Sequence, residues 1–129
     1  MIIFWYNQYK GLAVFTGCGH PTLDLILEMV HNISDLPIYA IGGGLHFPLT
    51  KGRGSKAGLE LQQIIGTGKP PWENIGKNDI QSTINIINQI KPEKVYLSGH
   101  DSCDYALELL KENLLAETKT LKAGESYII

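Results

Sequence analysis

The sequence lacks an excess of positive charge, because its 11 lysines and arginines are outnumbered by 13 aspartates and glutamates. A surface that binds nucleic acid needs basic side chains to neutralise phosphates, so we expect no nucleic-acid partner. Long apolar runs are also missing, since no segment approaches the roughly 18 apolar residues of a membrane-spanning helix. The first ten residues, MIIFWYNQYK, lack the basic region of a signal peptide. We therefore expect a cytoplasmic protein without a membrane partner.

Cysteine is scarce, since Cys18 and Cys103 are the only two. A pair so far apart provides neither a disulfide framework nor a CxxC zinc site. In a reducing compartment we expect both residues as thiols, and a disulfide between them is the less favoured alternative.

The 129 residues have the length of one domain, and no repeat or linker divides residues 1–129. Short apolar runs alternate with segments of helical periodicity. We expect strands at residues 11–16, 36–41, 94–97, 117–121 and 126–129, and helices at 22–33, 57–65, 78–90 and 103–114. Thr22 and either Asn78 or Asp79 are the expected N-caps, and the glycines at 42–44 are expected to end the second strand. This alternation predicts an α/β fold, with helices packed on at least one face of a sheet.

Three of the four histidines, His20, His46 and His100, follow the ends of predicted strands within three to five residues. Open α/β sheets gather ligand-binding groups at the carboxyl ends of their strands, so neighbouring strands would bring these side chains together. Neutral imidazole is a good ligand for zinc, iron and manganese, and the three histidines are our predicted metal ligands. For each one alone, a turn histidine bonded to backbone is an equally good interpretation. His31 lies on the polar side of the first predicted helix and is expected to be a surface residue.

Two other chemistries stay open. Cys18 precedes His20 by two residues and Cys103 follows His100 by three, so either thiolate could be paired with a base. Cys103 also falls on the apolar stripe of its helix, which favours a core position.

Glycine-rich segments, GRGSKAG and GTGKPP, resemble phosphate-binding loops without matching the P-loop or dinucleotide patterns. They could supply Lys51, Arg53, Lys56 or Lys69 to an anionic substrate, although lysines in exposed loops are most often solvated.

The motifs TGCGHP, IGGGLHF and LSGHDSCD occur in an order and spacing that resembles the C-terminal half of a metallo-β-lactamase-fold hydrolase. More narrowly, the chain is similar to the dihydropterin ribofuranosyl-aminobenzene phosphate synthase-like branch, from about Gly11 to the C-terminus. The resemblance implies half of an αββα sandwich, one sheet with helices packed on it. It also implies a divalent metal, zinc before iron or manganese, whose bound hydroxide attacks an ester or phosphoester.

By residue, the resemblance implies that His20 and His100 are metal-site positions and that His46 is a further site residue. It places Asp101 and Asp104 where a carboxylate could orient His100, and Asp101 is our candidate catalytic residue. In part of the branch the last turn reads His-Cys-Thr-Gly, a pattern that this chain does not follow, so no specific substrate is implied.

The first metal motif of this superfamily, His-x-His-x-Asp-His, does not occur in the sequence. The resemblance therefore implies an incomplete metal site and an apolar sheet face that a complementary N-terminal chain or self-association would cover. Our preferred hypothesis is the metal-binding C-terminal portion of such a hydrolase. The alternative is a non-catalytic α/β module that binds a phosphorylated small molecule or a partner protein. A requirement for metal separates the two.

Overall fold

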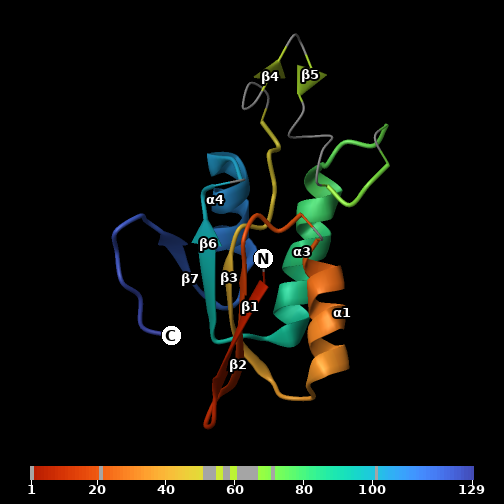
Figure 1. The fold of residues 1–129 in the computed structure, drawn as a ribbon. Helices are drawn as coiled ribbons and strands as arrows, with labels where there is room; N and C mark the ends of the chain where they lie inside the picture. Colours follow the sequence, from red (N-terminus) through yellow and green to blue (C-terminus); the bar gives the residue numbers. More distant parts are fainter. Residues whose placement is uncertain are drawn as a thin grey trace.

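A five-stranded sheet with strand order β1-β2-β3-β6-β7 is the centre of the fold in the computed structural model (Figure 1). The structure describes residues 2–20, 22–50, 55–56, 59–60, 67–70, 72–100 and 102–129. The sheet contains β1 (Ile2–Asn7), β2 (Gly11–Thr16), β3 (Ile38–Gly43), β6 (Lys94–Ser98) and β7 (Glu117–Leu121). The edge strand β1 runs antiparallel to β2, whereas the other neighbours are parallel. Two short strands, β4 (Ser55–Lys56) and β5 (Leu59–Glu60), pair separately.

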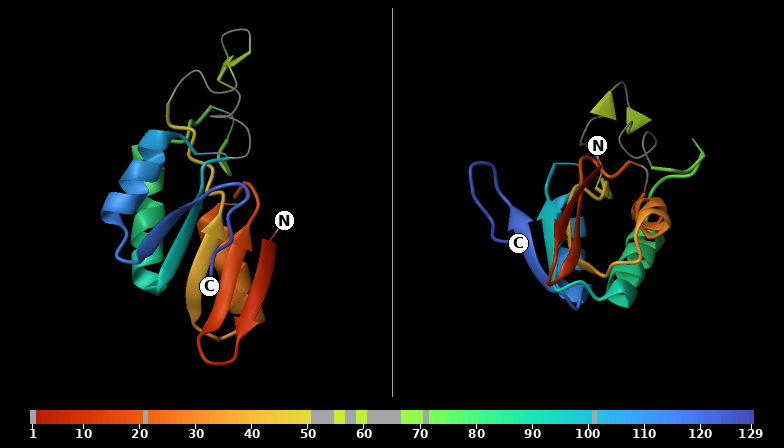
Figure 2. Two further views of the ribbon diagram at one scale, coloured as in Figure 1. Left: turned by 90° about the vertical axis from the view of Figure 1, so that its left-hand side faces the viewer. Right: turned by 60° about the horizontal axis from the view of Figure 1, so that its bottom comes forward.

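The helices α1 (Leu23–Ile33), α3 (Lys77–Ile90) and α4 (Asp104–Asn113) lie on one face of the sheet (Figure 2). Successive residues of a strand point to opposite faces, so Leu12 and Val14 of β2 share a core with the helices. Val95 and Leu97 of β6 contribute to the same core. Helix α1 buries residues three and four positions apart, as an amphipathic helix does: Leu23, Ile26, Leu27 and Val30. Within the described residues, no helix is long and apolar enough to cross a bilayer.

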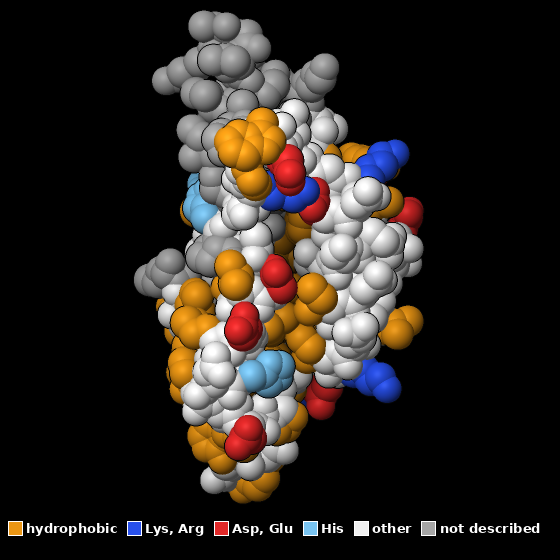
Figure 3. Space-filling model, turned by 90° about the vertical axis from the view of Figure 1, so that its right-hand side faces the viewer, with side chains coloured by type: hydrophobic (Ala, Val, Ile, Leu, Met, Phe, Trp, Pro, Cys, Tyr) orange, Lys and Arg blue, Asp and Glu red, His pale blue; other side chains and the backbone are white. Residues whose placement is uncertain are grey.

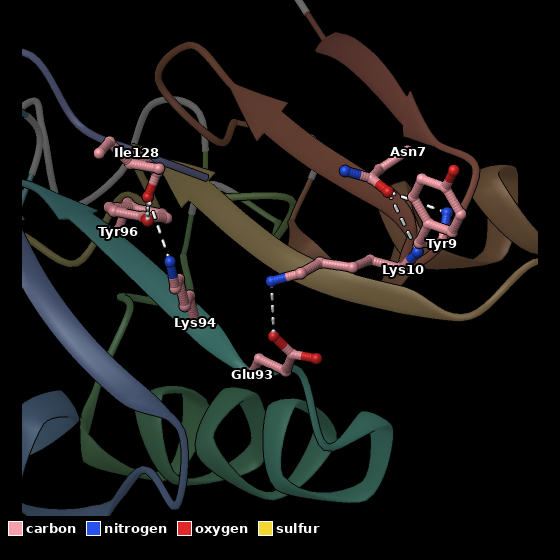
Figure 4. A network of polar contacts seen from close by, with 7 residues as sticks. All are labelled: Asn7, Tyr9, Lys10, Glu93, Lys94, Tyr96 and Ile128. Atoms are coloured by element: carbon pink, nitrogen blue, oxygen red, sulfur yellow. Dashed lines mark hydrogen bonds and ion pairs between the residues drawn. The ribbon is translucent and has the colours of Figure 1, made fainter.

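The opposite face of the sheet is only partly covered. Near β6, the segment after β7 folds back over it, and the Tyr96 hydroxyl donates a 2.7 Å hydrogen bond to the carbonyl of Ile128 (Figure 4). The Tyr127 ring packs edge-on against Tyr96, with ring centroids 6.0 Å apart. At the β1 side of this face, Ile3 and Trp5 keep 49% and 63% of their surface exposed. We call this surface, from β1 to β7 on the side away from the helices, the open face.

A surface ion pair joins the turn between β1 and β2 to the start of β6. The Lys10 ammonium lies 3.1 Å from the Glu93 carboxylate, and the side chain of Asn7 accepts hydrogen bonds from the backbone of Tyr9 and Lys10 (Figure 4). Exposed ion pairs of this kind contribute little to the free energy of unfolding, so we assign no large stabilisation to this one.

The expected α/β fold is confirmed, but some element boundaries were wrong. Strand β3 begins at Ile38 and ends at Gly43, instead of ending before the glycines. Glycine is needed at position 42 of this strand, because an added Cβ would lie 2.6 Å from the ring of Phe15. The residues 126–129 are not a strand, and their described contacts are made largely with side chains.

The helix starts also differ in detail. Gly76 is the N-cap of α3, and Asp79 lies inside the helix, where its carboxylate accepts a 2.7 Å hydrogen bond from the Gly76 N–H. Thr22 is the N-cap of α1, but its side chain makes no capping hydrogen bond. Leu59 and Glu60 form β5, so the helix expected at residues 57–65 is wrong there, and the rest of that stretch lies outside the described residues.

Candidate functional site

The candidate site lies at the edge of the sheet where β2, β3 and β6 end. These strands are adjacent and parallel, so their carboxyl ends meet at one edge. The turn that follows β2 carries His20, the turn after β3 carries His46, and the turn after β6 carries His100. The fold therefore assigns the three histidines to three neighbouring turns.

Hydrogen bonds to backbone carbonyls hold the first two turns together. The Thr16 hydroxyl, at the end of β2, donates a 2.7 Å hydrogen bond to the Gly44 carbonyl, and the Gly44 N–H donates to the Gly17 carbonyl at 2.9 Å. Gly19 has a positive φ of 77°, and a Cβ at this position would lie 2.3 Å from the Gly44 oxygen. Only glycine permits both the conformation and the close approach.

This packing brings two imidazoles together. The ring centroids of His20 and His46 are 4.5 Å apart and the ring planes are inclined by 53°. His46 is 4% exposed and has a left-handed φ of 53°, whereas His20 is exposed. One imidazole of this histidine pair is thus fixed in the protein, and the other is accessible from solvent.

The third turn is bonded to the residue that follows His46. The Phe47 N–H donates to the Ser102 hydroxyl at 3.2 Å, and the Cys103 N–H donates to the Phe47 carbonyl at 3.1 Å. Ser102 is 1% exposed. Ser102 is not among the predicted site residues, and because its partner Phe47 lies 55 positions away, no local pattern identifies this contact. His100 itself is exposed, and its backbone N–H donates to the Ser98 hydroxyl at 3.3 Å.

The donor set fits part of a metal site. Two close imidazoles suit zinc and related metals, but a structural or catalytic zinc needs at least three protein ligands. Among the described residues, no three side chains of His, Cys, Asp or Glu gather closely enough to hold an ion. Asp101 lies outside the described residues, and Asp104 is an exposed residue at the start of α4. An ion at the histidine pair therefore requires ligands beyond this pair.

Both cysteines are thiols, as expected. Cys103 is the N-cap of α4 and is 4% exposed. Burial opposes ionisation of its thiol, but hydrogen bonds from the Ala106 backbone and from Thr50 and Leu49 outweigh burial and hold the pKa below its ordinary value. Its burial limits access by reagents or substrates, which disfavours the Cys103 version of the Cys/His alternative.

A cleft of about 330 Å³ adjoins the histidine pair. His46 and Gly19 line it together with residues from the first turn of α1 and from α3. Lys69 also lines it, and its ammonium lies 2.7 Å from the carboxylate of Asp79. Of the other basic residues considered for an anionic substrate, Lys51 and Arg53 lie outside the described residues, as does the side chain of Lys56.

No protein-family profile matches this chain, and no curated protein matches it. Among solved structures, it is similar to the crystal structure of Tm1679, a metal-dependent hydrolase of the β-lactamase superfamily, with a TM-score of 0.69 and 20% sequence identity. The match covers 98% of this chain and 39% of that chain. The five-stranded mixed sheet with helices on one face is therefore a β-lactamase-like half-sandwich, and the chain spans about two fifths of the length of this neighbour.

Proposed function

We propose that this chain is the metal-binding portion of a cytoplasmic metal-dependent hydrolase that cleaves an ester or phosphoester. The observation that carries the proposal is the histidine pair, His20 and His46, which the contacts of Thr16 and Gly44 hold at the carboxyl edge of a half-sandwich. The similarity to a metal-dependent hydrolase supports the same interpretation through the fold.

Each residue has a role in the proposal. His20 and His46 bind a divalent ion, zinc in the first instance, and His100 joins them from the turn after β6. Asp101 orients His100 as the positioning carboxylate. When bound, such an ion lowers the pKa of a water molecule to about 7 and polarises the scissile bond. The buried His46, fixed by its neighbours, orients the pair, because a preorganised ligand needs no rearrangement during the reaction.

The proposal also includes a partner for the open face. Ile3 and Trp5 expose large apolar surfaces there, although such side chains are normally buried when they cluster. The neighbour is longer than this chain, which covers only 39% of it. We propose that a complementary half-sandwich packs on the open face and supplies the remaining metal ligands.

The metal proposal is tested by elemental analysis of the purified chain after incubation with zinc and gel filtration. We expect bound zinc in the wild type and in His31→Ala, whose histidine is exposed on α1 away from the strand ends. His20→Ala and His46→Ala should lose the metal, with circular dichroism showing that both remain folded. Equal zinc in all four folded proteins would contradict the proposal, and no zinc in any of them would favour the non-catalytic binding module.

The partner proposal is tested by light scattering and by binding of an apolar dye. With a complementary half as the occupant, the isolated chain should be monomeric and should bind the dye on its open face, and Trp5→Ser should reduce the dye signal. A stable dimer that Trp5→Ser dissociates would instead identify a second copy of the chain as the occupant.

A further inference from the structure

The cleft between α1 and α3 has the features of a binding site for a small organic group. Its volume of about 330 Å³ is at the lower end of the range for ligand pockets. Figure 3 shows the hollow between the two helices, with hydrophobic side chains inside it and charged side chains at its upper end. His46 is one of the lining residues, so the cleft adjoins the histidine pair.

The walls of the cleft are largely apolar. They include aliphatic and aromatic side chains from α1, α3 and the segments between them: Leu23, Leu25, Leu45, Phe47, Ile75 and Ile86. Three residues with hydroxyl groups, Thr67, Ser82 and Thr83, also line the cleft. Such a lining accommodates a flat ring or a short aliphatic group and provides a few hydrogen bonds that can orient it.

The charges around the cleft disfavour an anion. Lys69 is the one lysine or arginine among the described lining residues, and Asp79 neutralises it at 2.7 Å. The second oxygen of Asp79 accepts the hydrogen bond from the Gly76 N–H, so both oxygens of this carboxylate have partners within the protein. Asp24 lines the cleft, and no ion pair or hydrogen bond of its side chain is found within the described part of the chain. It therefore remains as an uncompensated negative charge.

The N-terminus of α1 partly offsets the negative charge of Asp24, because a helix N-terminus is equivalent to about half a positive charge. Leu23, Asp24 and Leu25 form this first turn and line the cleft. The full charge of the Asp24 carboxylate exceeds the helix contribution. Among the described residues that line the cleft, the exposed carboxylate of Asp24 is therefore the charge without an opposite partner, which favours a neutral or cationic group over a carboxylate or phosphate.

We propose that this cleft binds the organic part of the substrate, and that this part is a small apolar group that is neutral or carries an amino or amidino substituent near Asp24. The identification of the ligand as a substrate rests on the proposed function, whereas its binding in the cleft does not. The bond to be cleaved then lies outside the cleft, beside His20 and His46, where the proposed metal would act.

The test uses three probes of similar shape, benzamidine, benzamide and benzoate, which are cationic, neutral and anionic at neutral pH. Binding is measured with the full chain, without added metal, by changes in the amide NMR spectrum. We expect benzamidine to bind about fivefold more tightly than benzamide, from one carboxylate contact near water, and benzoate to bind most weakly. The shifted amides should belong to α1, α3 and the turn of His46.

Two variants assign the effect to the cleft. Asp24→Asn should remove the preference for benzamidine while the affinity for benzamide stays within twofold. Ser82→Trp, at an exposed position that lines the cleft, should block all three probes, whereas Asn85→Trp, on the same helix but outside the lining, should not.

Benzoate binding as tightly as benzamidine, shifts confined to the open face, or no binding at millimolar probe would each overturn the cleft proposal. The metal experiment is read separately. Benzamidine binding with zinc unaffected by His20→Ala and His46→Ala would retain the cleft and reject the hydrolase. Loss of zinc from both variants, without binding of any probe, would support the metal site and reject the cleft proposal.

Discussion

The hydroxyl of Thr16 donates a 2.7 Å hydrogen bond to the carbonyl of Gly44 and thereby joins the end of β2 to the turn that carries His46. Thr16 is 9% exposed, so water cannot easily replace this donor. The separation of the histidine pair depends on the distance between the two turns, and this hydrogen bond is one of the contacts that sets it.

Replacement of Thr16 by valine should therefore destabilise the chain by about 1–2 kcal/mol, because the Gly44 carbonyl loses its buried donor. Thr120→Val is the matched control. The Thr120 hydroxyl on β7 is buried, and no hydrogen-bond partner is found for it within the described residues. Its removal should leave stability unchanged or increase it by up to about 1 kcal/mol. Urea unfolding of both variants measures the difference. Equal destabilisation would show that the hydrogen bond from Thr16 to Gly44 makes no particular contribution to the free energy of unfolding.

Replacement of Gly19 by alanine should separate the first two turns. Gly19 and Gly124 have similar positive φ angles, 77° and 83°, but an added Cβ at Gly124 meets nothing within 4 Å. Gly124→Ala should cost about 1 kcal/mol from backbone conformation alone. Gly19→Ala should cost roughly 1–3 kcal/mol more, since its Cβ collides with Gly44, and it should weaken zinc binding. Thermal unfolding and zinc titration of the two variants test this, and indistinguishable results would mean that the turns can separate without cost.

The lowered pKa of Cys103 makes a prediction for stability against pH. Its folded pKa lies below the ordinary value of 9.0, so between these two values the unfolded chain binds more protons than the folded chain. The contribution of the thiol to stability should rise with pH through this window, stay constant above about pH 9, and be lost as pH falls through the folded pKa.

The measurement is the free energy of unfolding of wild type and Cys103→Ser at a series of pH values under reducing conditions. The difference should grow with increasing pH, whereas the difference between Cys103→Ser and Cys103→Ala, neither of which has a thiol, should not change. A wild-type advantage that shrinks towards pH 9 would contradict the hydrogen-bonding arrangement around the sulfur.

The local sequence pattern was sufficient to predict most elements. The apolar run Gly11–Thr16 matches β2, and the periodic segment that ends at Ile33 matches α1, with Thr22 as its N-cap. These elements follow from the spacing of apolar residues along the chain, which can be read from the sequence. The assignment of three histidine-bearing turns to one sheet edge also follows from strand order in a parallel sheet.

Contacts between distant segments account for what the sequence could not predict. The close packing of Gly42 in β3 depends on Phe15 and Tyr96 of the neighbouring strands, and the burial of His46 depends on turns separated by more than 20 residues. The bond from Phe47 to Ser102 joins residues 55 positions apart. No local pattern encodes such pairs, so His46 could be selected as a candidate but not recognised as buried.

In this chain, the residues that form the core of the sheet and the residues of the candidate site lie in different segments. The register of β2, β3 and β6 is set by residues such as Val14 and Ile41 inside the core, whereas the candidate ligands lie in the turns that follow these strands. Mutations can therefore accumulate in the turns and in the long connection between β3 and α3 without altering the strand pairing. Proteins with this half-sandwich can therefore differ in the ligands that they bind, while their core residues must continue to pack against one another.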